Sequence, residues 1–496
     1  MESTWAVAAV VTAVVAVATV FSVLKWAAKS LNEWIYEAKL GDRRLALPPG
    51  DLGWPLIGNM LGFLRAFKSK NPETFIDGYV SRYGKTGVYK VHLFGNPSVV
   101  VTTPETCRKV LTDDEAFQPG WPRAAVELIG EKSFIQMPQE EHKRLRRLTS
   151  APVNGFEALS NYIPYIEKNV LESLEKWSKM GPIEFLTQLR KLTFTVIMYI
   201  FLSSESEPVM EMLEKEYTRL NYGVRAMRIN LPGFAYHKAL KARKNLVAAL
   251  KGIVTERRRQ KLDKWAPKRK DMMDQLIDIV DENGRKLDDE EIIDILIMYL
   301  NAGHESSGHT MMWATILLNQ HPEVLKKARE EQEAIVRNRP AGQTGLTLKE
   351  CRDMEYLSKV VDETLRYVSF SLVVFREAQM DVNLNGYLIP KGWKVLAWFR
   401  SIHYDSEVYP DPKKFEPSRW DGFVPKAGEF LPFGAGSRLC PGNDLAKLEI
   451  CIFVHYFLLN YNLEWLTPDC EILYLPHSRP KDNCMAKITK KSSVAA

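Results

Sequence analysis

The apolar positions of the chain follow three patterns. Residues 6–24 form one uncharged apolar run, AVAAVVTAVVAVATVFSVL. Apolar residues recur with helical spacing over roughly residues 155–335. Two β-rich runs in residues 87–102 are separated by a Gly-Asn-Pro sequence, and a further β-rich part lies near residues 380–400. The pattern predicts a mainly α protein with small β-sheets, and a hairpin within residues 87–102.

The apolar run at residues 6–24 is long enough to cross a membrane. A helix rises about 1.5 Å per residue, so this segment nearly spans a hydrocarbon core of about 30 Å. A cleaved signal peptide begins with basic residues, but Glu2 is the only charge before the run, and Lys25, Trp26 and Lys29 follow it. Positive charge on the C-terminal side indicates that this side faces the cytosol. We expect a retained, single-pass N-terminal transmembrane helix.

A proline-rich hinge separates the predicted anchor from the rest of the chain. Pro48 and Pro49 fix the backbone and end any helix that reaches them. No repeat, Gly/Ser linker or low-complexity tract divides the remaining sequence. We therefore predict an anchor at residues 1–28, a linker and hinge at residues 29–58, and one large catalytic domain at residues 59–496.

The composition is that of a globular body in a reducing compartment. Of the 496 residues, 46% are hydrophobic and 26% charged, and the formal net charge is +6, which does not indicate nucleic-acid binding. The six cysteines include no CxxC pair. The sequence has no glycosylation sequon apart from Asn96-Pro97-Ser98, which the proline disqualifies. These features agree with a body that faces the cytosol.

One cysteine lies in a setting that favours its thiolate. The segment from Phe430 to Gly442, FLPFGAGSRLCPG, precedes a helix-like apolar run, so Cys440 sits where a loop becomes a helix. Backbone N–H groups and the dipole at a helix start stabilise negative charge on sulfur. Gly436 allows the loop to turn tightly beneath a flat cofactor, and Arg438 can reach a haem propionate.

The spacing around this cysteine indicates a family. A lone cysteine is more often a buried structural residue, but Phe433, Gly436, Arg438, Cys440 and Gly442 together match FxxGxRxCxG, a pattern specific for haem ligation. The chain thereby resembles the cytochrome P-450 family over essentially its whole length. The resemblance implies the fold of that family, with haem b as cofactor and the Cys440 thiolate as the axial ligand of its iron.

Other segments match the family in the same order along the chain. Glu363 and Arg366 form ExxR, and Arg419 follows within FEPSRW; in the family such a triad braces the haem loop. ExxR alone would be an ordinary i,i+3 ion pair of roughly a few tenths of a kcal/mol. By the resemblance, the further residues that contact the haem propionates are His142, which replaces the usual tryptophan, Arg146 and Arg376.

A helix expected to begin near Asp289 carries the oxygen-activating motif of the family. Ala302, Gly303, Glu305 and Ser306 match AGx(D/E)T, with serine in place of the usual threonine. Glycine in a helix interior costs about 1 kcal/mol relative to alanine, so we expect a ligand to lie against Gly303. By the resemblance, Glu305 and Ser306 are the catalytic pair that relays protons to bound oxygen.

The resemblance implies an NADPH- and O2-dependent monooxygenase. No GxGxxG opens a βαβ unit in the chain, so NADPH must deliver its electrons through a partner flavoprotein reductase. Lys143, Arg144, Arg147 and Lys447 are candidates for the surface that docks this reductase. The alternative from another class is a haem-thiolate isomerase or dehydratase that needs no reductase, although the acid and alcohol pair on the helix argues against it.

Longer stretches of the chain resemble one subgroup of the family. PPGDLGWPLIGNM, APVNGFEALSNYIPYIE and MYLNAGHESSGHT are similar to the plant ent-kaurenoic acid oxidases of gibberellin biosynthesis. This resemblance implies a diterpenoid acid substrate, several oxidation steps and an endoplasmic reticulum membrane location; a triterpenoid substrate is the alternative. A carboxylate in an apolar pocket needs a partner, and a bidentate arginine is favoured. The candidates are Arg123, Arg225 and Arg228.

Overall fold

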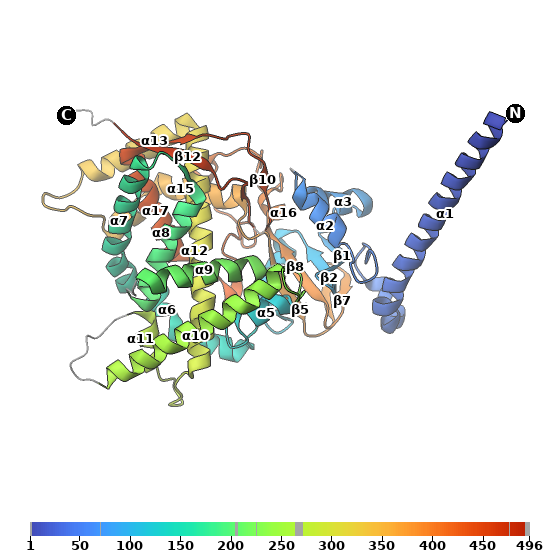
Figure 1. The fold of residues 1–496 in the computed structure, drawn as a ribbon, viewed down its shortest axis with the longest axis horizontal. Helices are drawn as coiled ribbons and strands as arrows, with labels where there is room; N and C mark the ends of the chain where they lie inside the picture. The colour runs from blue at the N-terminus through green and yellow to red at the C-terminus, as the bar shows by residue number, and fades with distance from the viewer. Residues whose placement is uncertain are drawn as a thin grey trace. The chain divides into compact units, whose positions relative to one another are not determined.

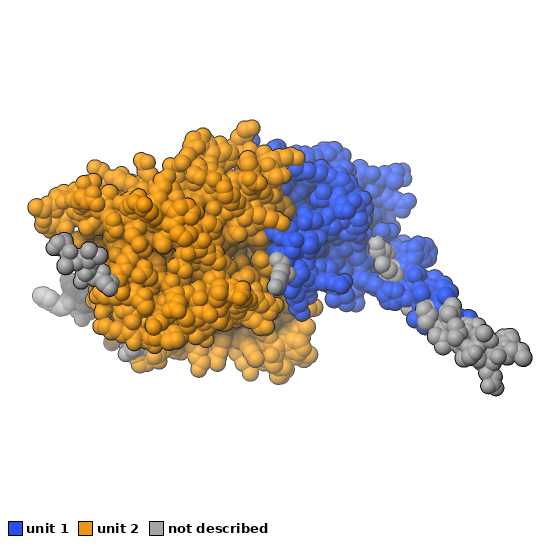
Figure 2. All heavy atoms as spheres, turned by 90° about the horizontal axis from the view of Figure 1, so that it is seen from above, with its two compact units in different colours: residues 1–120, 375–398 blue, residues 121–374, 399–496 orange. Residues whose placement is uncertain are grey.

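A computed structural model describes most of the chain as two compact units. The described residues are 2–69, 71–203, 207–224, 226–262, 271–475 and 477–491. Unit 1 comprises residues 1–120 and 375–398, and unit 2 comprises residues 121–374 and 399–496 (Figure 2). The chain therefore leaves unit 1, returns once to complete it, and ends in unit 2. The boundaries predicted at residues 28 and 58 stay predictions.

Unit 1 is built around a five-stranded sheet with the strand order β1-β2-β8-β5-β3 (Figure 1). Its strands are β1 (Val88–Leu93), β2 (Asn96–Val101), β3 (Phe117–Pro119), β5 (Val373–Ala378) and β8 (Lys394–Trp398). The predicted hairpin is confirmed, since β1 and β2 pair antiparallel with Val88 opposite Val101. Its two-residue turn has Phe94 at φ 53° and Gly95 at φ 78°, the left-handed backbone that matches the twist of a tight hairpin.

Short elements complete unit 1. β6 (Val382–Leu384) and β7 (Tyr387–Ile389) form a second hairpin, so the β-rich part predicted near residues 380–400 is confirmed. Aromatic rings join the helices to the sheet, since Phe75 stacks on Trp398 with ring centroids 5.7 Å apart. The helices after the N-terminal one are η1 (Ala38–Ala46), α2 (Met60–Lys68), α3 (Thr74–Tyr83) and α4 (Pro104–Thr112).

The N-terminal helix α1 (Glu2–Glu37) is longer than the predicted anchor and is fixed to unit 1. The apolar run lies inside it, and Val17 and Phe21 on that run are 70% and 58% exposed. Near its end Asn32, which is 1% exposed, donates from Nδ2 to the carbonyl oxygens of Leu52 and Trp54 at 2.8 and 2.9 Å. The hinge segment is therefore held against α1 by hydrogen bonds.

Among the described residues, one helix is long and apolar enough to cross a membrane, α8 (Phe185–Leu202). Most of its side chains are buried inside unit 2, where it packs against α12 (Asp289–Gln320). Burial by protein on most sides is typical of a core helix. We therefore interpret α8 as part of the body.

Unit 2 is mainly helical, and the helical stretch predicted over residues 155–335 is confirmed. The predicted start of α12 is also confirmed, because a carboxylate oxygen of Asp288 accepts the N–H of Glu291 and the Glu291 carboxylate accepts the N–H of Asp288. In Figure 1, α12 is the long yellow helix beside α8. The other helices are α5 (Arg123–Ile129), α6 (Gln139–Asn154), α7 (Phe156–Lys179), α9 (Glu207–Val224), α10 (Ala235–Lys261), α11 (Met272–Asp278), α13 (Pro322–Arg337), α14 (Leu348–Arg352), α15 (Glu355–Val368), α16 (Phe399–His403), η2 (Pro417–Trp420), η3 (Gly436–Arg438) and α17 (Asn443–Asn460).

Two small sheets complete unit 2. One has the strand order β4-β12-β9 and the other pairs β10 with β11. The strands are β4 (Pro182–Glu184), β9 (Tyr461–Trp465), β10 (Ile472–Leu473), β11 (Arg479–Pro480) and β12 (Met485–Lys490). A mainly α protein with small sheets is therefore what the sequence predicted.

Candidate active site

The cysteine loop, residues 430–442, brings Cys440 to the start of α17. The N–H of Cys440 donates to the carbonyl oxygen of Phe433 at 2.9 Å. Burial raises the pKa of the Cys440 thiol, while the N–H of Gly442 and the positive charge of Arg146 on α6 act in the opposite direction. Two features that favour a thiolate, a helix start and a guanidinium, therefore lie beside the sulfur.

Glycines shape the cysteine loop and leave room beside it. Gly434 and Gly436 have φ of 77° and 74°, a conformation that L side chains rarely adopt. A Cβ built on Gly434 would meet nothing within 4 Å, so the backbone conformation requires glycine there. At Gly442 a Cβ would touch only Val153, at 4.0 Å. The protein itself does not fill this space.

One face of α12 is open although most of the helix is buried. Ala302 is exposed, and Met298 and Ser306, one turn away on either side, are half-buried; we call these three residues the open stripe. The hydroxyl of Ser306 donates to the carbonyl oxygen of Ala302 at 3.1 Å. Burial raises the pKa of Tyr299 on α12 to about 12, and α12 packs against α17, the helix that follows the cysteine loop.

Gly303 lies where α12 packs closely against α8. A Cβ on Gly303 would lie 3.0 Å from Cδ1 of Ile197 in α8. The approach of α8 therefore gives a second reason for a small residue at this position. That a ligand lies against Gly303 stays a prediction.

Glu305 lies on another face of α12, in an ion pair with Arg190 of α8, and is 5% exposed. Ring nitrogens of His304 and His309 lie 3.6 and 3.5 Å from its carboxylate. Burial alone would raise the pKa of Glu305, but the charge of Arg190 and the two histidines hold it below its ordinary value. The structure does not bring Glu305 to the open stripe with Ser306, so their joint relay stays a prediction.

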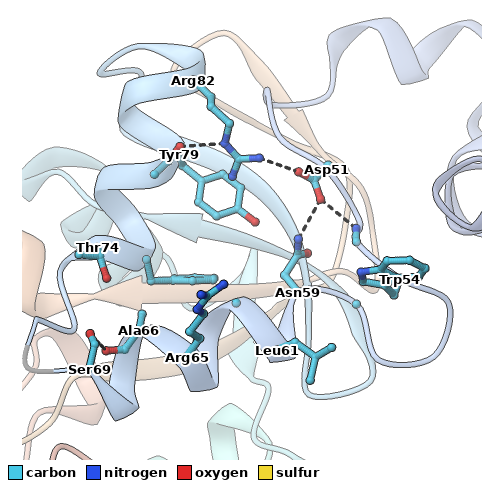
Figure 3. A pocket seen from close by; sticks show the side chains of 15 residues that line it. Asp51, Trp54, Asn59, Leu61, Arg65, Ala66, Ser69, Thr74, Tyr79 and Arg82 are labelled. Carbon is cyan, nitrogen blue, oxygen red and sulfur yellow. Dashed lines mark hydrogen bonds and ion pairs between the residues drawn. The ribbon is translucent and has the colours of Figure 1, made fainter. Parts of the chain in front are cut away.

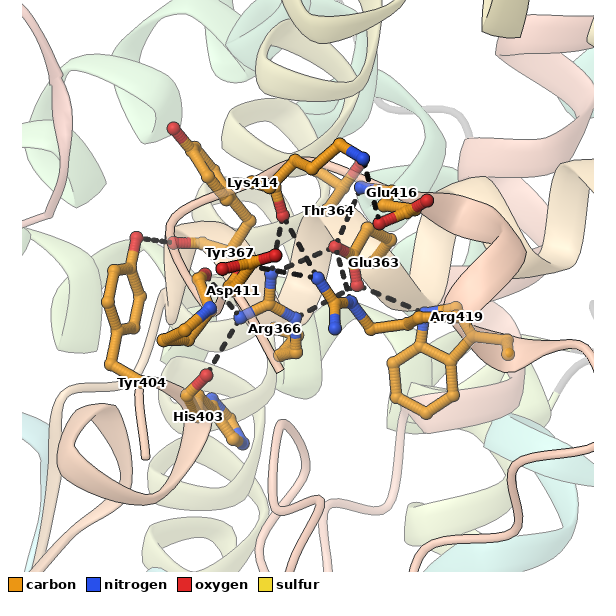
Figure 4. Close-up of polar contacts among 12 residues, drawn as sticks. Glu363, Thr364, Arg366, Tyr367, His403, Tyr404, Asp411, Lys414, Glu416 and Arg419 are labelled. Atoms are coloured by element: carbon orange, nitrogen blue, oxygen red, sulfur yellow. Dashed lines mark hydrogen bonds and ion pairs between the residues drawn. The ribbon is translucent and has the colours of Figure 1, made fainter. Parts of the chain in front are cut away.

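Figure 4 shows Glu363, Arg366 and Arg419 in one cluster. Glu363 and Arg366 are both 0% exposed, and Arg366 donates to the two carboxylate oxygens at 2.8 and 2.9 Å. Nε of Arg419 donates to Glu363 at 3.0 Å. The arginines also bind backbone, Arg366 the carbonyl oxygen of Pro412 and Arg419 that of Pro410, each at 2.8 Å. The structure assembles the predicted triad, and its role as a brace stays a prediction.

His403 links this cluster to the cysteine loop, a connection that the sequence did not reveal. Its carbonyl oxygen accepts from Nη1 of Arg366 at 2.8 Å, and its ring Nε2 accepts the N–H of Leu431 at 3.1 Å. Burial, together with Arg366 and Arg400, lowers the pKa of His403 to about 3, so the ring is neutral. Nδ1 then carries the proton and donates to Oγ of Ser369 at 2.8 Å.

The residues expected to bind the haem propionates lie in both units. In unit 2, Arg438 donates to the carbonyl oxygen of Met137 at 2.8 Å, and α6 carries the buried His142 and the half-buried Arg146. In unit 1, Arg376 is 4% exposed, and burial lowers the pKa of its guanidinium to about 10. Among the described residues no carboxylate forms an ion pair with Arg376. A buried cation of this kind fits an anionic ligand, and the propionate roles stay predictions.

Arg123 and Arg228 meet on one carboxylate. Glu127 of α5 accepts from Nε of Arg123 at 2.9 Å and from Nε and Nη2 of Arg228 at 2.8 and 2.6 Å, and the Tyr236 hydroxyl donates to it as well. These hydrogen bonds, with that of Arg228 the largest, lower the pKa of Glu127 to about 2. Two arginines against one acid leave an excess positive charge. Arg225 lies outside the described residues.

The basic residues expected to dock a reductase differ in availability. Arg144 is only 13% exposed in its side chain and pairs with three carboxylates, among them Asp281 at 2.9 Å. Lys447 likewise pairs with an acidic side chain at 2.7 Å. The side chains of Lys143 and Arg147 are 58% and 60% exposed. Both also pair with carboxylates, Lys143 with Glu140 and Arg147 with Glu282, and their greater exposure makes them better candidates for a docking surface than Arg144.

Most of the chain matches one protein family. The family model described as Cytochrome P-450 matches residues 48–480. The chain belongs to the cytochrome P-450 family. Ent-kaurenoic acid oxidase 2 of Arabidopsis thaliana is 68% identical to this cytochrome P-450 over 468 residues, which cover 94% of the chain and 96% of that relative. Ent-kaurenoic acid oxidase 1 of Hordeum vulgare is 57% identical over 495 residues, 99% of the chain and 98% of the relative.

Two further relatives extend the comparison. The 7,8-epoxymelianol synthase CYP88A51 of Citrus sinensis is 51% identical over 463 residues, 93% of the chain and 95% of that relative. Among solved structures, the retinoic-acid-bound cyanobacterial CYP120A1 is 27% identical with a TM-score of 0.80, covering 90% of this chain and 99% of that one. The predicted fold, mainly α with small sheets in the cytochrome P-450 arrangement, is confirmed.

Family membership determines the kind of enzyme and its cofactor. The chain is a cytochrome P-450 monooxygenase with haem-thiolate iron as cofactor, and NADPH supplies its electrons through a partner reductase. The residues present fit that cofactor, because the sulfur of Cys440 lies at a helix start, space adjoins Gly434 and Gly442, and the open stripe of α12 faces no packed side chain at Ala302. The predicted enzyme class and cofactor are confirmed.

Proposed function

We propose that this cytochrome P-450 oxidises ent-kaurenoic acid in successive steps to the first gibberellin. One observation carries the proposal: ent-kaurenoic acid oxidases of Arabidopsis thaliana, Hordeum vulgare and Oryza sativa subsp. japonica are 56–68% identical to it over at least 93% of its length. The 7,8-epoxymelianol synthase of Citrus sinensis is 51% identical. The higher identity favours the diterpenoid acid over a triterpenoid skeleton.

Microsomes that contain this chain and an NADPH-dependent reductase test the proposal. We expect NADPH-dependent conversion of ent-kaurenoic acid to products with added oxygen, identified by mass spectrometry. Microsomes with Cys440→Ala are the matched control and should convert nothing. Conversion of melianol but not of ent-kaurenoic acid would contradict the diterpenoid substrate and favour a triterpenoid one. Conversion that proceeds without the reductase would favour the isomerase or dehydratase class.

Ser306 has the proton-handling role in this proposal. When bound, haem supplies the oxygen chemistry by which one atom of dioxygen enters a carbon–hydrogen bond. The Ser306 hydroxyl holds its proton toward the carbonyl oxygen of Ala302, and rotation of the side chain turns it outward from the open stripe. Serine rotates more freely than threonine because it lacks the second branch on Cβ. Glu305 has to exchange its ion pair with Arg190 before it passes a proton to Ser306.

We further propose that α1 crosses the endoplasmic reticulum membrane once, with both units in the cytosol beside the flavoprotein reductase. The support is the uncharged run at residues 6–24, its exposed described side chains and the basic residues that follow it. The full chain should resist extraction from microsomes by carbonate, whereas a chain without residues 2–28 should be released. Extraction of the full chain would contradict a spanning helix.

The Glu127 cluster offers a partner to the substrate carboxylate. Arg123 and Arg228 carry one positive charge more than Glu127 neutralises, so a second carboxylate would complete the pairing. Arg228→Met should weaken binding of ent-kaurenoic acid but not of the neutral ent-kaurenol, measured by the substrate-induced shift of the haem absorption. Arg123→Met and Arg225→Met are the companion variants. Unchanged binding of the acid by all three would contradict arginine recognition at these positions.

A further inference from the structure

A hollow of about 590 Å³ lies in unit 1, formed by the hinge, α2 and α3 (Figure 3). Gly62 and Gly78 form part of its wall, and a Cβ on either would meet nothing within 4 Å. Trp54 and Tyr79 add aromatic surface. The hollow is therefore open space with mixed polar and apolar walls, and none of the described residues expected in the active site lines it.

The charges of this hollow favour an anion. Among the described residues that line the hollow, the charged ones are Asp51, Arg65 and Arg82, which gives an excess of one positive charge. Arg82 pairs with Asp51 at 3.1 Å and stacks 4.9 Å above the ring of Tyr79. Arg65 is exposed, and no carboxylate among the described residues forms an ion pair with it. Among the described lining residues, Arg65 is therefore a cation available to a ligand.

Contacts within unit 1 place the hollow beside the apolar run of α1. The ring of Trp54 lies 6.1 Å from that of Phe21, which belongs to the run at residues 6–24. Asn32 fixes this arrangement, since it binds the carbonyl oxygens of the hinge. If α1 spans the membrane, as proposed above, the hollow lies at the depth of the phospholipid headgroups.

Apolar side chains stand exposed next to the hollow. Trp54 and Gly58 close a tight turn by exchanging backbone hydrogen bonds at 3.1 and 2.6 Å. Leu56 occupies this turn at φ 63° and is 91% exposed, and Leu61 on α2 is 58% exposed. The left-handed backbone of Leu56 is strained, and its exposed apolar side chain suits contact with acyl chains.

We propose that this hollow binds the headgroup of an anionic membrane phospholipid. Arg65 pairs with the phosphate, the open walls at Gly62 and Gly78 admit the headgroup, and Leu56 and Leu61 rest among the acyl chains. The inference rests on the proposed membrane anchoring of α1. It adds a lipid site, and thereby a preference for anionic membranes, to the proposed function.

Titration of the full-length haem protein in dodecyl maltoside micelles with dihexanoyl phosphatidic acid, followed by calorimetry, tests this proposal. The parent protein should bind saturably. A lost charged hydrogen bond is worth more than about tenfold in affinity, so Arg65→Glu should weaken binding at least that much. Gly78→Leu should do the same by filling the hollow, and leucine favours the helix α3. Lys68→Glu is the matched control, because Lys68 is exposed on the same helix as Arg65 but does not line the hollow.

The outcomes separate the proposal from its rivals. Retention of the carbon-monoxide band typical of the family shows that each variant is folded. No saturable binding by the parent, or equal binding by Arg65→Glu, would overturn the proposal. Equally tight binding of inorganic phosphate would identify a free-anion site and overturn the lipid assignment. Because micelles replace the bilayer, these results do not depend on whether α1 spans a membrane, which carbonate extraction tests separately.

Discussion

The carboxylate of Glu363 holds two arginines together inside unit 2, and Glu363→Gln removes its charge with little change of shape. The side chain is 0% exposed and accepts from Arg366 at 2.8 and 2.9 Å and from Arg419 at 3.0 Å. The indole N–H of Trp420 donates to it at 3.2 Å. Glutamine offers one acceptor oxygen in place of two and turns an NH2 group toward the guanidinium donors.

The magnitude follows from burial. Loss of one member of a buried ion pair costs about 3–5 kcal/mol, because the remaining charge is left in a region of low dielectric. Here two guanidinium groups lose their shared partner, so we expect at least that range for Glu363→Gln. Since the free energy of unfolding of native proteins is only about 5–15 kcal/mol, this loss is a large fraction of the total stability.

Glu416→Gln is the matched control. This substitution removes the same charge from a surface ion pair. Oε2 of Glu416 lies 3.2 Å from Nζ of Lys414, and the side chains of Glu416 and Lys414 are 39% and 61% exposed. Such pairs contribute about 0–1 kcal/mol. Urea unfolding followed by circular dichroism should give a much lower midpoint for Glu363→Gln and nearly the parent midpoint for Glu416→Gln. Equal midpoints for the two variants would refute the reasoning about burial.

Three further predictions concern His403, Glu449 and Ser306. His403→Phe leaves the N–H of Leu431 without its acceptor, so the free energy of unfolding should fall by about 1–3 kcal/mol. The thiolate-type spectrum should also decay faster, and His403→Gln should partly restore it. A spectrum as stable as the parent's would contradict the link between His403 and the cysteine loop. Burial raises the pKa of Glu449 to about 8, so the folded protein keeps a proton that the unfolded chain releases above about pH 4.5. The melting temperature should therefore fall as pH rises toward 8, and Glu449→Gln should reduce this pH dependence. The same pH dependence in Glu449→Gln would contradict a protonated Glu449. Ser306→Ala should lower product formed per NADPH consumed more than NADPH consumption itself, and unchanged coupling would make Ser306 a packing residue.

Local sequence signals were sufficient where the deciding contacts are close along the chain. The hairpin in residues 87–102 follows from β-rich runs around a glycine turn, and α12 begins where Asp288 and Glu291 satisfy each other's N–H groups. Glu363 and Arg366 lie one turn apart on α15, so their pairing is readable from the spacing. The family pattern added Arg419, which no periodicity connects to them.

Contacts between distant segments could not be predicted in the same way. The ring of His403 is buried and neutral and accepts the N–H of Leu431, and the sequence does not show that this histidine is buried. The sequence suggests that Arg144 is a free surface charge, but it forms an ion pair with Asp281, which lies in a loop far along the chain. The course of α1 also involves a distant contact, because the helix runs to Glu37 and Asn32 near its end binds the hinge. In each case tertiary packing decides which polar atoms meet.

The central claim is that the thiolate of Cys440 holds the haem iron, and the carbon-monoxide spectrum of the reduced protein tests it most directly. Cys451 is the matched control, because it lies buried within α17 and burial raises the pKa of its thiol to about 12, which disfavours a thiolate. We expect Cys451→Ser to keep the band that gives the family its name and Cys440→Ser to lose it. A Cys440→Ser protein that still shows that band would contradict the assignment.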